Sequence, residues 1–290
     1  MRSSPPCTGG RSSTARTSAE PPGGLSGVDT FDVSALALAL LVLAAFAAGW
    51  VDAVVGGGGL VQLPALLIGL PADAPPASVL GTNKLSSVFG TTTSAITYAR
   101  RLRPDWRTVL PLVVASAAGS AVGAQLAKLL PRELFTPIVL VALVGVGLYT
   151  WRRPRLGLVS ERKHDGSAHY VRTAVIGLGV GAYDGFLGPG TGSFFVILLV
   201  GVLGYGFLEA SAKAKIANVA TNLSAIAVFA AHGSVLWALG LAMGAANLVG
   251  GLVGARTALR QGNGFVRKVF LIVVAALIVK LGYDTIQQIC

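Results

Sequence analysis

The stretch AGWVDAVVGGGGLVQLPALL, Ala48–Leu67, decides the fold class of this chain. It belongs to a run from residue 33 to residue 72 in which Asp52 is the one charged side chain. A helix needs about 20 apolar residues to cross the hydrocarbon core of a bilayer, so this run is too long for one pass. The glycines Gly56–Gly59 interrupt it, and the short apolar segment after them cannot cross alone at about 1.5 Å per residue. The sequence therefore predicts a hairpin with a glycine tip.

The composition places the whole chain in a bilayer. Of its 290 residues 53% are apolar and only 12% are charged, whereas about a quarter are charged in an average soluble domain. The net charge of +11 lies in short basic stretches between long apolar runs. This distribution is typical of membrane topology and not of nucleic-acid binding. Cys7 and Cys290 sit at opposite ends of the chain, which excludes a disulfide scaffold or a cysteine metal site.

The second half of the chain repeats the plan of the first. The run Thr173–Leu208 holds one charge, Asp184, and is interrupted by glycine and proline at Gly188–Gly192. Three further spans follow each hairpin: 77–99, 108–129 and 134–151 in the first half, and 215–231, 235–255 and 266–283 in the second. We therefore predict a disordered tail over residues 1–31, a first membrane repeat over 32–151, a basic cytoplasmic linker over 152–172 and a second membrane repeat over 173–290.

Three motifs occur in the same order in both halves. Gly49-x-x-Asp52-x-x-x-Gly56-x-Gly58 matches Gly181-x-x-Asp184-x-x-x-Gly188-x-Gly190, Thr82-Asn83 matches Thr221-Asn222, and Gly119-x-x-x-Gly123-Ala124 matches Gly250-x-x-x-Gly254-Ala255. Such internal symmetry is typical of transporters that are built from repeats. The fold class that we predict is an all-α integral membrane protein with two repeats, each a glycine-tipped hairpin plus three transmembrane helices.

The distribution of positive charge predicts that the two repeats are inverted. An odd number of crossings in each half places nearly all basic loop residues on one face, which by the positive-inside rule is cytoplasmic. That set consists of Arg100, Arg101, Arg103 and Arg107, the six basic residues of the linker, and Arg256, Arg260, Arg267 and Lys268. The opposite face keeps only Lys128 and Arg132, and both termini are then expected outside.

Asp52 and Asp184 are the chemically informative charges. A carboxylate at the bilayer centre costs about 2.5–3.5 kcal/mol on insertion scales, so each one needs a partner or a function. We expect Asp52 to pair with Lys84 and Asp184 to pair with Lys215, one pair in each half. The pairs are equally compatible with a structural lock and with a role in handling a substrate or a proton.

The glycine tips predict an anion site. Irregular backbone at membrane depth is tolerated only where protein or a water-filled cavity satisfies it, and the helices after the tips would point positive N-termini at the same centre. Thr82, Asn83, Thr221 and Asn222 offer neutral hydrogen bonds there or, alternatively, join helices. The candidate binding residues are Gly56, Gly57, Gly58, Gly59, Thr82, Asn83, Gly188, Gly190, Thr191, Thr221 and Asn222. We expect no catalytic residue, metal or cofactor.

Several of these segments resemble one known family. The stretches Ala48–Leu67, Gly81–Thr91 (GTNKLSSVFGT), Ala214–Phe229 (AKIANVATNLSAIAVF) and Trp237–Gly262 are similar to the TauE/SafE family of sulfite exporter-like membrane permeases. The likeness covers about residues 35–284. It implies a multi-pass protein of the bacterial cytoplasmic membrane that moves small sulfur-containing anions such as sulfite, thiosulfate or organosulfonates. A homodimer is compatible with the sequence.

Two other classes remain as alternatives. Pro64-Ala65-Leu66 and two membrane aspartates are ingredients of an intramembrane aspartyl protease, but here the PAL segment lies between the aspartates instead of after them. A channel or a scaffold subunit is compatible with the chemistry of the chain, although a repeat within one chain favours a single carrier site. The absence of a Walker motif leaves an ion gradient or downhill flow as the energy source.

Overall fold

The computed structural model describes residues 34–71, 74–127, 144, 148, 152, 160, 161, 163 and 166–289. These residues form helices and connecting turns and contain no strand, which confirms the all-α prediction for this part of the chain. The predicted tail, nearly all of the span 134–151 and about half of the linker 152–172 lie outside the described residues. The end of the predicted linker, residues 166–172, is already helical, so the second repeat begins earlier than the predicted residue 173.

Each half contains a long helix, a short helix and then two further helices. In the first half these are α1 (Ala35–Val55), α2 (Gly58–Gly69), α3 (Pro76–Leu102) and α4 (Trp106–Leu126). In the second half they are α6 (Gly166–Phe186), α7 (Thr191–Leu203), α8 (Phe207–Ala231) and α9 (Trp237–Ile289). The long α9 consists of two helical segments separated at Gly262, where φ is +81°. Both predicted hairpins therefore exist, with their breaks at the predicted glycines.

The short helices cannot span a bilayer. At 12 and 13 residues, α2 and α7 are about 18–20 Å long, against a hydrocarbon thickness of about 30 Å. In the described part of the chain, 4 segments are long and apolar enough to cross, namely α1, α4, α8 and the stretch Trp237–Ala276 of α9. The chain is thus a helical membrane protein with two apolar helices that are too short to cross.

The residues at which the helices begin correct one part of the alignment between the two halves. Ala35 and Gly166, Pro76 and Phe207, and Trp106 and Trp237 are equally far apart along the chain. This spacing places Lys84 at the position of Lys215, so the match of Thr82-Asn83 with Thr221-Asn222 is wrong by about two helical turns. A match of only two polar residues is too short to define register in a helix rich in Ala, Ser and Thr.

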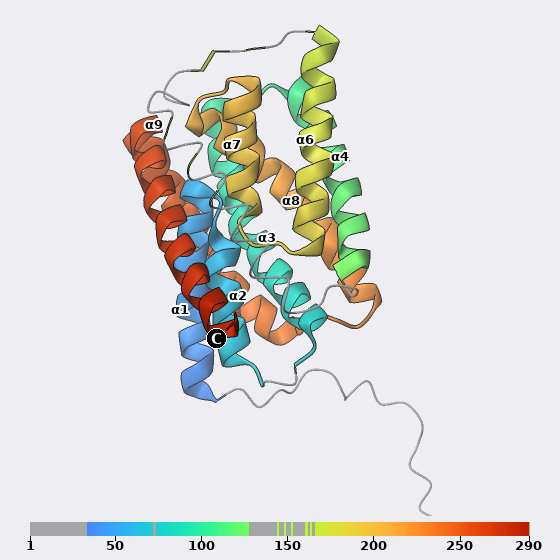
Figure 1. The fold of residues 1–290 in the computed structure, drawn as a ribbon, viewed down its shortest axis with the longest axis vertical. Coiled ribbons are helices and arrows are strands. Elements are labelled where there is room, and N and C mark those ends of the chain that lie inside the picture. The colour runs from blue at the N-terminus through green and yellow to red at the C-terminus, as the bar shows by residue number, and fades with distance from the viewer. Residues whose placement is uncertain are drawn as a thin grey trace, which may run out of the picture.

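The two halves are intertwined and do not lie side by side. In the first hairpin α1 packs along α9, and in the second hairpin α6 packs along α4, so each hairpin lies on a helix of the opposite half. Between these groups α3 and α8 contact each other. In Figure 1, α1 begins at the lower end of the molecule and α6 begins at the upper end. These opposite directions agree with inversion, and the complete inverted repeat stays a prediction.

The contact between each hairpin and the opposite half depends on paired glycines. A Cβ atom on Gly123 of α4 would lie 2.1 Å from the carbonyl oxygen of Ala182 in α6. In the other half, a Cβ atom on Gly250 of α9 would lie 2.0 Å from the carbonyl oxygen of Phe46 in α1. Neither position has room for a side chain, so these small-xxx-small motifs pack helix backbones together, as the sequence predicts.

We predict that Gly123→Val destabilises the protein and that Gly179→Val does not. The first substitution forces α4 and α6 apart, with an expected loss of about 1–3 kcal/mol. Gly179 lies on an exposed face of α6, and a Cβ atom there meets nothing within 4 Å. Thermal unfolding of the purified variants in detergent measures the difference. Equal unfolding midpoints for the two variants would contradict the close packing of α4 on α6.

Candidate functional site

The two glycine tips touch each other at the centre of the molecule. Ser193, in the first turn of α7, donates its backbone N–H to the carbonyl oxygen of Gly56 at 3.1 Å. The Ser193 hydroxyl donates to the carbonyl oxygen of Val55 at 2.9 Å. A Cβ atom on Gly192 would lie only 2.5 Å from the Cα atom of Gly56. The structure therefore brings the tips together, as the sequence analysis expects.

A left-handed glycine ends the first helix of each hairpin. Gly56 has φ +84° and Gly188 has φ +87°, a region in which a side chain is strained. The Gly56 N–H donates to the carbonyl oxygen of Asp52 at 2.7 Å, which closes the last turn of α1. Each aspartate thus lies one helical turn before its tip glycine, and the turn directs the chain into the short helix.

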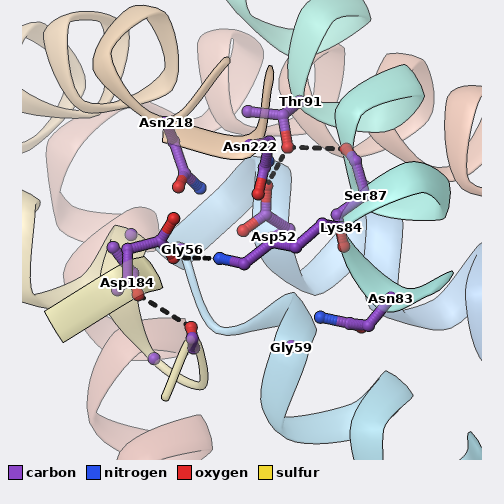
Figure 2. Close-up of a pocket in the computed structure, with 14 residues that line it drawn as sticks. Asp52, Gly56, Gly59, Asn83, Lys84, Ser87, Thr91, Asp184, Asn218 and Asn222 are labelled. Carbon is purple, nitrogen blue, oxygen red and sulfur yellow. Dashed lines mark hydrogen bonds and ion pairs between the residues drawn. The ribbon is translucent and has the colours of Figure 1, made fainter. Parts of the chain in front are cut away.

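A small polar cavity lies beside the joined tips. It encloses about 20 Å³, room for about one water molecule. Figure 2 shows that its walls come from both hairpins and from α3 and α8. The lining residues are Asp52, Gly56, Gly59, Asn83, Lys84, Ser87, Thr91, Asp184, Gly188, Gly190, Thr191, Gly192, Asn218 and Asn222.

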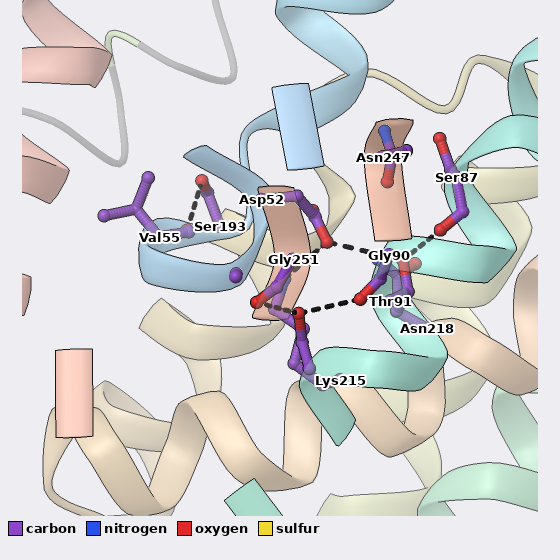
Figure 3. A network of polar contacts seen from close by, with 12 residues as sticks. Asp52, Val55, Ser87, Gly90, Thr91, Ser193, Lys215, Asn218, Asn247 and Gly251 are labelled. Atoms are coloured by element: carbon purple, nitrogen blue, oxygen red, sulfur yellow. Dashed lines mark hydrogen bonds and ion pairs between the residues drawn. The ribbon is translucent and has the colours of Figure 1, made fainter. Parts of the chain in front are cut away.

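Two ion pairs cross from one half of the chain to the other. Lys84 Nζ lies 2.6 Å from Asp184 Oδ1 (Figure 2), and Lys215 Nζ lies 2.9 Å from Asp52 Oδ2 (Figure 3). The expected pairing of Asp52 with Lys84 and of Asp184 with Lys215 is therefore wrong. The reason is the intertwined packing, in which each hairpin packs along a helix of the opposite half in addition to helices of its own half, and α3 contacts α8.

The two carboxylates have different surroundings. The Thr91 hydroxyl lies 3.4 Å from Asp52 Oδ2, and the Asp52 side chain is 13% exposed. The Asp184 side chain is only 2% exposed, and its buried Oδ2 atom has no hydrogen-bond partner among the residues that the structure describes. The sequence alone treats these residues as equivalent, and the structure distinguishes them.

Most of the predicted binding residues gather at the cavity, and four do not line it. Gly56, Gly59, Asn83, Gly188, Gly190, Thr191 and Asn222 contribute to its walls. The residues outside the lining are Gly57, Gly58, Thr82 and Thr221. The hydroxyl of Thr82 accepts the N–H of Leu236, just before α9, at 3.0 Å, and the hydroxyl of Thr221 donates to the carbonyl oxygen of Asn218 at 3.0 Å.

Four lining residues, Ser87, Thr91, Gly192 and Asn218, are not among the binding residues predicted from the sequence. A usable signal exists for three of them. Lys84-x-x-Ser87-x-x-x-Thr91 and Lys215-x-x-Asn218-x-x-x-Asn222 have identical spacing, and steps of three and four residues place polar side chains on one face of a helix. Aligning the halves on their lysines instead of on the Thr-Asn pairs reveals this match.

The cavity offers hydrogen-bond donors and two helix N-termini. The helices α2 and α7 begin at Gly58 and Thr191, and no side chain caps either N-terminus. The N–H groups of a first helical turn lack acceptors within the helix and carry partial positive charge. Two asparagine side chains add buried atoms without partners, Asn83 Oδ1 and Asn222 Nδ2. Among the described residues, no group of three or more His, Cys, Asp or Glu side chains could hold a metal ion.

Comparison with known proteins connects this geometry to a family. A model of the family described as Sulfite exporter TauE/SafE matches residues 41–281. The chain belongs to the TauE/SafE family. The matched region includes both hairpins, both ion pairs and the cavity of this TauE/SafE protein.

Bacterial relatives of this TauE/SafE protein have been named as transporters. A Sinorhizobium protein named "Probable membrane transporter protein ORF9" is 39% identical over 247 residues, which cover 85% of this chain and 93% of the relative. A probable membrane transporter protein of Haemophilus influenzae is 32% identical over 87% of this chain and 97% of its own. The probable membrane transporter protein YfcA of Escherichia coli K12 is 33% identical over 89% of this chain and 94% of its own. No solved structure matches this chain.

We predict energetic coupling within the crossed pairs. Removing one charge strands its buried partner, so Asp52→Asn combined with Lys215→Met should be less destabilising than the sum of the single substitutions. The expected coupling energy is about 0.5–3 kcal/mol. Thermal unfolding in detergent measures it, with Asp52→Asn and Lys84→Met as the comparison cycle. A larger coupling energy in the comparison cycle would show that Asp52 pairs with Lys84, within its own half, and would contradict the crossed pairs.

Proposed function

We propose that this protein is a secondary permease of the bacterial cytoplasmic membrane and that it carries small sulfur oxyanions such as sulfite, thiosulfate or organosulfonates. The observation that carries the proposal is the convergence of two uncapped helix N-termini and the Lys84 ammonium on one buried cavity. In a poorly hydrated site, the partial positive charges of the helix N-termini favour an anion, and Lys84 adds a full positive charge once Asp184 no longer neutralises it. The sulfite exporter name of the family supports sulfur among the possible oxyanions.

The anion would be held mostly by neutral donors. Backbone N–H groups near Gly59 and Thr191 lie at the two tips, and Asn222 Nδ2 is a buried donor on the cavity wall. Both lysines are paired with carboxylates in this conformation, so the positive charge of a lysine becomes available only when its aspartate is protonated or moves away. Because these donors are neutral, the empty site contains no uncompensated charge while both ion pairs are formed.

The cavity is small in the described conformation. A cavity of about 20 Å³ holds about one water molecule and is too small for a sulfur oxyanion. Loading therefore requires the walls to separate, and the predicted inverted repeats would let the site open to either face of the membrane in turn. Because the tips and the ion pairs join opposite halves, relative motion of the halves would alter all of these contacts together.

The protease alternative has less support than the permease. In an aspartyl protease two carboxylates share one proton, whereas here each carboxylate pairs with its own lysine. The relatives described above are named probable membrane transporters, and none is named an enzyme.

Transport in proteoliposomes tests the proposal. We expect the purified protein to catalyse saturable uptake and counterflow of at least one of three radiolabelled anions, sulfite, thiosulfate and a short alkyl sulfonate. Counterflow is the property of a carrier, because the loaded site must return across the membrane. Flux that neither saturates nor shows counterflow would favour a channel. No flux of any of the three anions would show that the substrate assignment is wrong.

A second prediction concerns the size of the cavity. A Cβ atom on Gly59 would project toward the second tip, 3.5 Å from the Cα atom of Pro189 and 3.9 Å from Asn83 Nδ2, which are ordinary contact distances. Gly59→Ala should therefore fold and yet obstruct the site, and it should weaken substrate affinity about fivefold, the equivalent of about 1 kcal/mol.

The matched control for this prediction is Gly179→Ala, which adds the same methyl group on the exposed face of α6. Half-saturation concentrations for the two variants give the comparison. Equal values, with both proteins intact, would place the anion away from Gly59. By contrast, Gly58 is unsuitable for this test, because a Cβ atom there would lie 2.6 Å from the carbonyl oxygen of Ala48 in α1.

A further inference from the structure

We propose that the two crossed ion pairs have different roles, with Asp184 binding the proton that releases Lys84 for the anion and Asp52–Lys215 remaining closed as a tie between the halves. This inference rests on the proposed function, because it identifies the coupling ion and the residues that exchange it. Three differences between the pairs support it: the hydrogen bonds of the carboxylates, the positions of the lysines and the neighbouring polar side chains.

The first difference lies in the carboxylates. Asp52 Oδ2 accepts from Lys215 Nζ at 2.9 Å, and its side chain is partly exposed. The Thr91 hydroxyl lies 3.4 Å from the same oxygen, but its single proton has a closer acceptor in the carbonyl oxygen of Ser87 at 2.7 Å. Asp184 binds Lys84 through Oδ1 alone, and its other oxygen is buried without a partner. An ionised oxygen without a donor is costly in an apolar interior. A proton on Asp184 Oδ2 removes that cost, whereas Asp52 gains nothing comparable.

The second difference lies in the lysines. Lys84 is part of the cavity wall, and its Nζ atom lies 3.3 Å from the position that a Cβ atom on Gly188 would occupy. Its ammonium therefore borders both the cavity and the second glycine tip. Lys215 is fully buried and is not among the residues that line the cavity. Of these two lysines, Lys84 is the one that an anion in the cavity can reach.

The third difference lies in the polar side chains that follow the two lysines on α3 and α8. Thr91 and Asn222 occupy matching positions, each seven residues after its lysine. The Thr91 hydroxyl donates to the carbonyl oxygen of Ser87 at 2.7 Å and lies 3.4 Å from Asp52 Oδ2, so its hydrogen bonds are made within the protein. Asn222 lines the cavity with an amide nitrogen that has no partner. The polar side chain on the Thr91 side is thus already bonded within the protein, and the Asn222 side leaves a donor for a ligand.

Lys84 is the charged group in direct contact with Asp184. On the same helix Tyr183 donates its hydroxyl to the carbonyl oxygen of Pro189 at 2.7 Å. From α1 and α8, Asp52 and Lys215 lie at or near the cavity as a closed pair. The sequence of α7 and the part of α4 packed on Gly185, around Ser120, contain no titratable side chain. Protonation of Asp184 therefore leaves one nearby positive charge uncompensated, that of Lys84.

The charge balance defines the coupling. In the empty site, the Asp184 carboxylate and the Lys84 ammonium sum to zero. A proton forms an O–H bond at Asp184 Oδ2, the carboxyl becomes neutral, and Lys84 keeps its own proton and positive charge. A singly charged oxyanion then replaces the carboxylate as the counter-ion of Lys84. One proton and one negative charge enter together, so transport of such an anion is electroneutral and responds to a pH gradient but not to the membrane potential.

Proteoliposomes with an imposed pH gradient test the assignment, with Asp52→Asn as the matched control for Asp184→Asn. The substrate is a short alkyl sulfonate, whose single charge does not change over the pH range used. In the wild type, the half-saturation concentration should rise about tenfold per pH unit where Asp184 is ionised in the empty protein, as for one linked proton.

Asparagine resembles a protonated aspartate, so Asp184→Asn should retain counterflow, lose accumulation driven by the pH gradient and show less than a twofold change in half-saturation concentration per pH unit. Any transport that remains in Asp52→Asn should keep the wild-type pH response. Gradient-driven accumulation by Asp184→Asn, or a pH response lost in Asp52→Asn instead, would overturn the assignment.

An infrared measurement separates this inference from the proposed function, because it needs no substrate. The difference spectrum of the purified protein between acidic and neutral pH should contain the carbonyl band of a protonated carboxyl group. That band should disappear in Asp184→Asn, shift in Asp184→Glu and persist in Asp52→Asn. If no sulfur oxyanion is transported but the band behaves in this way, the substrate is wrong and the proton site stands. If the band is missing, or disappears in Asp52→Asn, the proton site is wrong.

Discussion

A carboxylate that leaves water costs several kcal/mol unless a cation or hydrogen-bond donors compensate for its charge. Asp52 and Asp184 both lie in long apolar helices, and each finds its cation on a helix of the opposite half. Neither half can therefore neutralise its own aspartate, so the charged centre exists only when both halves have assembled around it. The crossed pairs thus link the stability of the membrane fold to the geometry of the candidate site.

The glycine tips satisfy a second requirement by the same interlocking. Non-helical backbone within a membrane protein needs partners other than lipid, and the tips provide them for each other through Gly56 and Ser193. The contact leaves the helix N-termini of α2 and α7 beside the cavity. One arrangement therefore satisfies the backbone of the tips and prepares an anion site. The direct contact between the tips also accounts for the small volume of the cavity.

Much of this arrangement could be predicted because membrane helices obey simple constraints of length, hydropathy and glycine placement. The breaks at Gly56–Gly59 and Gly188–Gly192, the paired packing glycines and most of the cavity lining follow from those constraints. The errors concern relations between helices. Pairing Asp52 with Lys84 assumed that residues close in sequence meet in space, and aligning Thr82-Asn83 with Thr221-Asn222 used too few residues to define register.

The sequence by itself determined that this chain is a helical membrane protein of the TauE/SafE family with two glycine-broken hairpins, because hydropathy and motif order are local properties of a chain. Only the tertiary structure decided which lysine neutralises which aspartate and which polar side chains line the cavity. The physical reason is that helices distant in sequence pack across the two halves, so each charge is compensated by a residue whose position local patterns do not specify. Among the described residues, the same packing left Asp184 with a buried oxygen that lacks a partner and kept Asp52 partly exposed, a difference that the matching motifs conceal.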